Sequence, residues 1–101
     1  MIDLDDEDYC ELLTILKRHL KNCRLYAFGS RVTGNNQRFS DVDLCIMDDD
    51  PIPLGVLDDL REALSESSLP VSVDIMDIHA ISEEFKEVIE RADKILMPIH
   101  E

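Results

Sequence analysis

The chain has 101 residues, 45% of them hydrophobic, and its 23 acidic against 10 basic side chains give a formal net charge of -13. This length predicts a single domain over residues 1–101, and the excess of acid argues against DNA or RNA as a primary partner, because nucleic-acid affinity depends largely on Lys and Arg. No signal peptide or long apolar span is recognisable, and the three cysteines lack C-x-x-C spacing, so we expect a cytoplasmic protein without membrane contact.

Helix and strand patterns alternate along the chain. Residues 5–21 repeat apolar side chains at three- and four-residue steps, with acids in the first turn and bases in the last, which predicts an amphipathic helix aligned with its own dipole. The stretch RLYAF, residues 24–28, is a short apolar strand that stops at Gly29, and residues 41–47 are a second strand. Pro53 then opens a helix with a leucine stripe.

The last third of the chain predicts a strand, a helix and an extended segment. Residues 71–78 alternate as a half-buried strand does, Ser82 is placed to cap the following helix, and residues 94–99 are expected to be extended. The expected inner face of that helix carries Phe85, Val88, Ile89 and Ala92. Because the second and third strands alternate, we expect an α/β fold with helices packed on one face of the sheet and the other face free for chemistry.

Three aspartates share the polar parity of these strands. Asp41 and Asp43 are two residues apart, so their side chains leave the same face with Cα atoms roughly 6.5 Å apart. Asp74 has the polar parity of the third strand, whereas Asp77 has the parity of the apolar set. Like charges side by side are destabilising unless a cation lies between them, and carboxylates without His or Cys favour Mg²⁺ or Mn²⁺. A metal site at Asp41, Asp43 and Asp74 follows if the two strands are neighbours.

Gly29 and Ser30 provide the second half of the predicted site. Glycine lets the backbone approach a phosphate closely, and the N–H groups of a short turn together with the serine hydroxyl favour an anion. Arg31 and Arg38 add local positive charge to an otherwise acidic protein. A nucleoside triphosphate with magnesium would satisfy both halves, with its phosphates at Gly29 and Ser30 and the metal at the aspartates.

These residues resemble a known signature. A Gly-Ser pair, ten residues, an Asp-x-Asp pair and a later strand aspartate resemble the polymerase-beta-type nucleotidyltransferases. The stretches AFGSRVTG, FSDVDLCI, LREALSESSLPVSVDIMD and SEEFKEVIE are similar to the minimal nucleotidyltransferase (MNT) family, the antitoxins of HEPN/MNT toxin-antitoxin pairs. The similarity covers about residues 25–91.

The resemblance implies a small mixed sheet with helices packed on one face, and a type VII-like antitoxin that transfers AMP from ATP to a tyrosine of a HEPN ribonuclease toxin. Asp41 and Asp43 would then bind two Mg²⁺ ions, and Asp74 would be a third ligand and general base. Gly29 and Ser30 would bind the phosphates of ATP.

Two alternatives stay open. One is a non-catalytic, nucleotide-binding antitoxin that neutralises its partner by occlusion, and the other is a transferase with a different acceptor, such as an RNA end or a small molecule. The net charge of -13 favours a basic protein partner, because complementary charge accelerates encounter.

Overall fold

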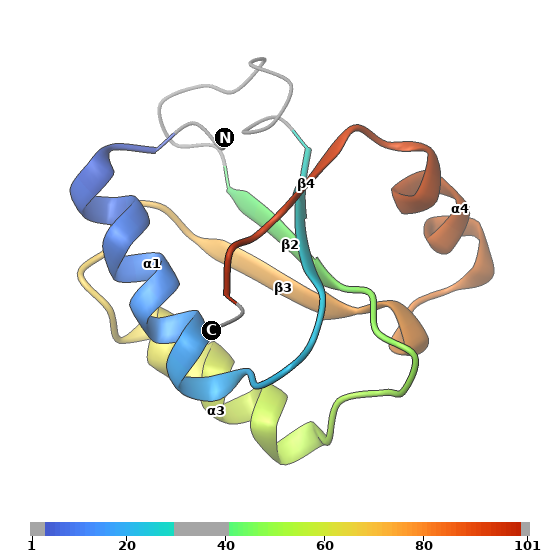
Figure 1. The fold of residues 1–101 in the computed structure, drawn as a ribbon, viewed down its shortest axis with the longest axis horizontal. Coiled ribbons are helices and arrows are strands. Elements are labelled where there is room, and N and C mark those ends of the chain that lie inside the picture. The colour runs from blue at the N-terminus through green and yellow to red at the C-terminus, as the bar shows by residue number, and fades with distance from the viewer. Residues whose placement is uncertain (1–3, 30–40, 100–101) are drawn as a thin grey trace.

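The computed structural model describes residues 4–29 and 41–99, in which a four-stranded sheet lies between helices (Figure 1). The helices of this part of the chain are α1 (Asp6–His19), α3 (Leu54–Ser65), α4 (Glu83–Arg91) and the short 3-10 helix η1 (Ile78–Ala80). Its strands are β1 (Leu25–Phe28), β2 (Val42–Ile46), β3 (Val73–Asp77) and β4 (Lys94–Leu96). None of the helices described combines the length and apolar character that a membrane span requires.

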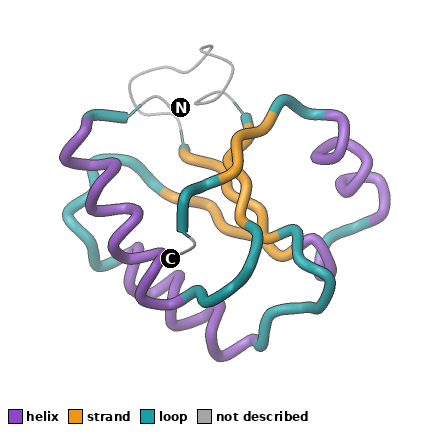
Figure 2. The backbone as a smooth tube through the Cα atoms, in the orientation of Figure 1, coloured by secondary structure: helices purple, strands orange, loops and turns teal. Residues whose placement is uncertain are grey.

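The strands follow the order β3-β2-β1-β4 across the sheet. β1 is antiparallel to both of its neighbours, whereas β2 and β3 are parallel. A parallel pair needs a crossover connection, and α3 supplies it. Figure 2 shows the strands running through the middle of the molecule with helices on either side. This mixed sheet with packed helices confirms the fold class expected from the sequence.

The main core lies between one face of the sheet and the helices α1 and α3. Val42, Leu44 and Ile46 alternate along β2 and are completely buried, as the strand pattern predicted. The helices contribute Leu12, Leu16 and Leu60, which are also completely buried. Because each such side chain contributes about 1.5–3 kcal/mol on burial, this layer supplies most of the force that holds α1 and α3 to the sheet.

The helix α4 lies on the opposite face, across the sheet from α1 and α3 (Figure 1). Its Ile89 is completely buried and packs with Phe28 and Cys45. This arrangement differs from the expectation that all helices share one face, and the expected inward position of Phe85 and Val88 is wrong, since they are 41% and 60% exposed. The physical reason is size: α4 has nine residues and meets only a small apolar area of the sheet, which Ile89 covers.

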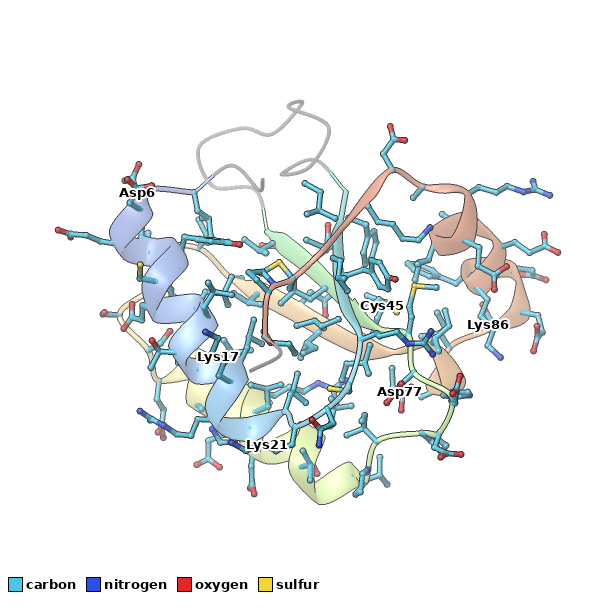
Figure 3. All side chains as sticks on the ribbon, viewed as in Figure 1. Asp6, Lys17, Lys21, Cys45, Asp77 and Lys86 are labelled. Atoms are coloured by element: carbon cyan, nitrogen blue, oxygen red, sulfur yellow. The ribbon has the colours of Figure 1, made fainter. Side chains whose placement is uncertain are left out.

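Asp77 is the last residue of β3, and its side chain joins two loops near the carboxyl-terminal end of that strand. Its side chain is buried, with the residue 3% exposed. One carboxylate oxygen accepts a hydrogen bond from the N–H of Ile52 at 2.8 Å, and the other accepts one from the N–H of His79 at 3.0 Å. The loop before α3 and the start of η1 are therefore held by one carboxylate (Figure 3).

We expect Asp77→Ala to lower the free energy of unfolding by about 2–4 kcal/mol, because two partly buried backbone N–H groups lose their charged acceptor. Urea denaturation followed by circular dichroism measures this loss. Asp77→Asn is the matched control, since its single amide oxygen still accepts one of the two hydrogen bonds and the loss is then smaller. Equal stability of all three proteins would contradict a structural role for Asp77.

Candidate active site

β2 and β3 bring Asp43 and Asp74 together. The two residues are register partners in the parallel ladder, so their side chains leave the same face from strands about 4.8 Å apart. Asp43 is half-buried and Asp74 is exposed. Asp41 is exposed, directly precedes β2 and shares the parity of Asp43. The structure thus pairs Asp43 with Asp74 and places Asp41 just before β2, at the amino-terminal ends of two parallel strands.

Gly29 lies against the carboxylate of Asp43. It follows β1, whose last residue, Phe28, is the register partner of Asp43. Its φ of +82° is a conformation that residues with a side chain rarely adopt. A Cβ added at this position would lie 2.5 Å from the Oδ2 atom of Asp43. The backbone conformation therefore favours glycine here, and any side chain would displace the carboxylate of Asp43.

The carboxylates affect one another electrostatically. Desolvation by burial raises the pKa of Asp43, and the charges of Asp74 and Asp41 raise it further. Each of these causes disfavours the ionised form of Asp43. A cation bound at this place would reverse the balance, because it would attract all three charges.

The donor set fits a hard divalent cation. Carboxylate oxygens are the ligands that Mg²⁺ and Mn²⁺ prefer, and the raised pKa of Asp43 marks a place where negative charge lacks compensation. Within residues 4–29 and 41–99, however, no three His, Cys, Asp or Glu side chains converge as a ready-made metal site. The chemistry of the donors and their shared sheet face thus favour a metal ion, and its binding would draw the carboxylates together.

The remaining residues expected at the site lie outside the described part of the chain. These are Ser30, Arg31 and Arg38. Of the phosphate-binding residues predicted from the sequence, the described part of the chain therefore contains Gly29. Asp77, which the parity of β3 separated from Asp74, has the structural contacts given above.

Lys94 is a neighbour of the site that sequence reasoning missed. It is the register partner of Phe28 on β4, so Asp74, Asp43, Phe28 and Lys94 form one row across the sheet. Its Nζ donates hydrogen bonds to the carbonyls of Ile89, at 3.4 Å, and Glu90, at 3.0 Å, and so lies at the carboxyl end of α4. Only the strand order reveals this placement, because no motif surrounds Lys94.

Cys45 lies on the same sheet face, in the layer between the sheet and α4 (Figure 3). Burial and the nearby charge of Asp77 raise the pKa of its thiol to about 11. Burial also raises the pKa of the Cys23 thiol, whereas Cys10 is exposed. Since the thiolate is the reactive form, Cys45 and Cys23 are expected to be inert in the folded protein.

We expect a disulfide reagent at pH 8 to modify one of the three free cysteines of the folded protein, Cys10, and all three in denaturant. Absorbance of the released chromophore measures both stages. Cys10→Ser is the control and should remove the fast reaction. A thiol that still reacts at the original rate in that variant would mean that α4 or α1 opens readily.

Comparison with known protein families agrees with this geometry. Residues 11–101 match the family described as "Polymerase beta, Nucleotidyltransferase". The chain belongs to the polymerase-beta nucleotidyltransferase family, and the resemblance drawn from the Gly-Ser and Asp-x-Asp motifs is confirmed. It is a nucleotidyltransferase.

Individual relatives place it within that family. It is 39% identical over 90 residues to the probable protein adenylyltransferase MntA of Haemophilus influenzae, covering 89% of this chain and 79% of the relative. A toxin-antitoxin crystal structure with AMP-PNP has a TM-score of 0.64 at 23% identity, covering 85% of this chain and 70% of that one. A tri-AMPylated HEPN toxin in complex with MNT antitoxin, from Shewanella oneidensis, has a TM-score of 0.59 at 18% identity, covering 90% of this chain and 71% of that one. The two structures support the fold.

Proposed function

We propose that this chain is a Mg²⁺-dependent protein adenylyltransferase that acts as the antitoxin of a HEPN ribonuclease toxin, by transferring AMP from ATP to a tyrosine of that toxin. The observation that carries the proposal is the placement of Asp43 and Asp74 as register partners beside Gly29. The relative named as a probable protein adenylyltransferase, at 39% identity, supports a protein as the acceptor.

The carboxylates have distinct tasks in this reaction. Asp41 and Asp43 would hold the magnesium ions, which when bound stabilise negative charge on the reacting phosphate and on the leaving pyrophosphate. Asp74 is exposed beside them and accepts the proton of the tyrosine hydroxyl, whose ordinary pKa of ~10 leaves it a weak nucleophile at neutral pH. The tyrosine oxygen forms a bond to the α-phosphorus as the bond from that phosphorus to pyrophosphate breaks.

The triphosphate of ATP would bind at the end of β1. The backbone of Gly29 lies there beside the Asp43 carboxylate, and Ser30, Arg31 and Arg38 follow it in the sequence with hydroxyl and guanidinium donors. These groups would bind the triphosphate and balance part of the charge of the departing pyrophosphate.

The acidity of the protein supports a basic partner. A net charge of -13 would attract a ribonuclease with a basic surface and would accelerate encounter at low ionic strength. A cytoplasmic location is part of the same proposal, because ATP is available there and the three free cysteines would stay reduced.

Intact-mass spectrometry tests the proposal directly. A HEPN toxin, the proposed acceptor, is incubated with the chain, ATP and Mg²⁺, and in parallel with the Asp41→Asn/Asp43→Asn variant. A gain of whole AMP units on the toxin with the unmodified chain alone is expected, and fragmentation should place them on tyrosine. Tight binding by both proteins without a mass change would instead support an antitoxin that acts by occlusion.

A further inference from the structure

Exposed apolar side chains gather on one segment of the chain. Among the described residues, four large hydrophobic side chains are exposed, and three of them lie between residues 83 and 96. The four are Leu54 at 74%, Phe85 at 41%, Val88 at 60% and Leu96 at 50%. Phe85 and Val88 are three residues apart on α4 and so are neighbours on its surface. Single exposed apolar residues need no explanation, but an adjacent pair on one helix does. We call Phe85 and Val88 together the apolar stripe of α4.

This stripe lies on the same side of the sheet as the aspartates. Ile89 fastens α4 to that face through Phe28 and Cys45, and Phe28 is the register partner of Asp43. Leu96 is the register partner of Tyr26, which is in turn the partner of Cys45, so the side chain of Leu96 leaves this face as well. The opposite face is covered by α1 and α3 (Figure 2).

Both ends of α4 are fixed by hydrogen bonds. The Ser82 side chain accepts a hydrogen bond from the N–H of Phe85 at 3.2 Å, which caps the first turn. Lys94 donates to the carbonyls of the last turn. The apolar stripe is therefore presented on a helix that is already ordered, and a partner binding there loses little conformational entropy to the ordering of α4.

The helix that carries the stripe is mostly acidic, with four glutamates against Lys86 and Arg91. Glu84 is exposed one turn before Val88, and Arg91 is exposed three residues after it. Lys86, visible on α4 in Figure 3, is paired with Glu83 at 3.1 Å, which neutralises one of the few positive charges on the helix. A partner with apolar side chains at its centre and Lys or Arg around them would complement this surface.

We propose that the outer face of α4, centred on Phe85 and Val88, is the docking surface for the protein acceptor, and that the acceptor's docking segment is apolar with a basic rim. The inference rests on the proposed function in one respect, that the acceptor is a protein. A protein acceptor is oriented by contact with the surface around the reacting groups, and α4 lies on the face from which Asp43 and Asp74 project.

The test compares Phe85→Ala/Val88→Ala with Leu54→Ala. Leu54 is the matched control because it is the most exposed of the four side chains and belongs to α3, on the other side of the sheet. Affinity for the HEPN toxin used in the mass-spectrometric test is measured by calorimetry without ATP. We expect the double variant to bind about 10- to 100-fold more weakly, as when interface anchors are truncated, and Leu54→Ala to bind within about 2-fold of the unmodified chain.

The same variants are then assayed for AMP transfer. The KM for the toxin should rise with the double variant, whereas the KM for ATP should stay unchanged. Unmodified chain that binds the toxin but adds no AMP would refute the proposed function, and the calorimetric comparison would still decide the docking surface. Equal affinity of the double variant and the unmodified chain would overturn the docking surface and leave AMP transfer standing.

Two further outcomes are decisive. If circular dichroism shows that the double variant is unfolded, Val88→Ala replaces it, because a residue 60% exposed contributes little to packing, and unchanged affinity in that variant overturns the proposal. Glu84→Gln/Glu87→Gln should weaken binding at low salt and lose that effect at high salt. Affinity independent of these glutamates at every salt concentration would contradict the basic rim.

Discussion

Replacing Asp43 by Asn is expected to reduce AMP transfer by at least about 1,000-fold while making the protein more stable at neutral pH. The loss follows because an amide is a poor ligand for a hard cation and lacks the charge that balances it. The gain follows because Asp43 is half-buried and repelled by Asp74 and Asp41, so its ionised form is unfavourable in the folded state. Toxin mass and thermal unfolding of the same sample measure the two effects.

The pH dependence of that gain has a definite sign. The pKa of Asp43 is raised in the folded protein, so protonation favours the folded state, and this contribution is present at acidic pH and lost as the pH rises through the folded-state pKa. The amide of the Asp43→Asn variant is neutral throughout this range. The difference in melting temperature between the variant and the unmodified chain should therefore be largest at pH 7, without added metal, and should shrink towards pH 4. A variant less stable than the unmodified chain at pH 7 would contradict the electrostatic account.

Gly29→Ala is expected to lower AMP transfer by about 100-fold, because a displacement of about 1 Å at a reacting group has an effect of that size. The new Cβ would lie 2.5 Å from Oδ2 of Asp43, so the carboxylate or the strand must move. The φ of +82° adds backbone strain, and we expect the free energy of unfolding to fall by about 1–2 kcal/mol. Mass spectrometry of the toxin and urea denaturation measure the two losses.

Gly55→Ala is the matched control for that variant. Gly55 lies in α3, and a Cβ there would meet no atom within 4 Å. Alanine is the better helix former, so this variant should be as active as the unmodified chain and more stable by up to about 1 kcal/mol. If Gly29→Ala behaved like Gly55→Ala, the close contact with Asp43 would have no functional importance.

The site could be predicted within each strand but not between strands. Side-chain parity is a local property with a period of two, which is why the sequence separated Asp74 from Asp77 and placed Asp41 with Asp43. Strand order depends on long-range contacts that no spacing records. The register of Asp43 with Asp74, and the row that ends at Lys94, therefore came only from the structure.

The prediction for the last helix was wrong for a related reason. Apolar spacing identified the helix correctly, including its cap at Ser82, but spacing cannot tell how much apolar surface a helix will meet. The sheet offers α4 enough to bury Ile89 and leaves Phe85 and Val88 in solvent. From the sequence alone, a helix with more apolar side chains than the sheet can cover looks the same as a helix that is fully packed in a core.

The crossover through α3 connects the two strands that carry Asp43 and Asp74 to the core behind the sheet. Asp43 and Asp74 stand on strands that are parallel, and the connection between them passes through α3 on the opposite face. Leu60, at the centre of that helix, is completely buried in the core shared with β2 and β3. The backbone ladder of β2 and β3 sets the spacing of these two carboxylates, and the core that Leu60 shares keeps the two strands in place from behind. Selection for the proposed reaction would therefore also restrict the volume of core residues that no ligand touches.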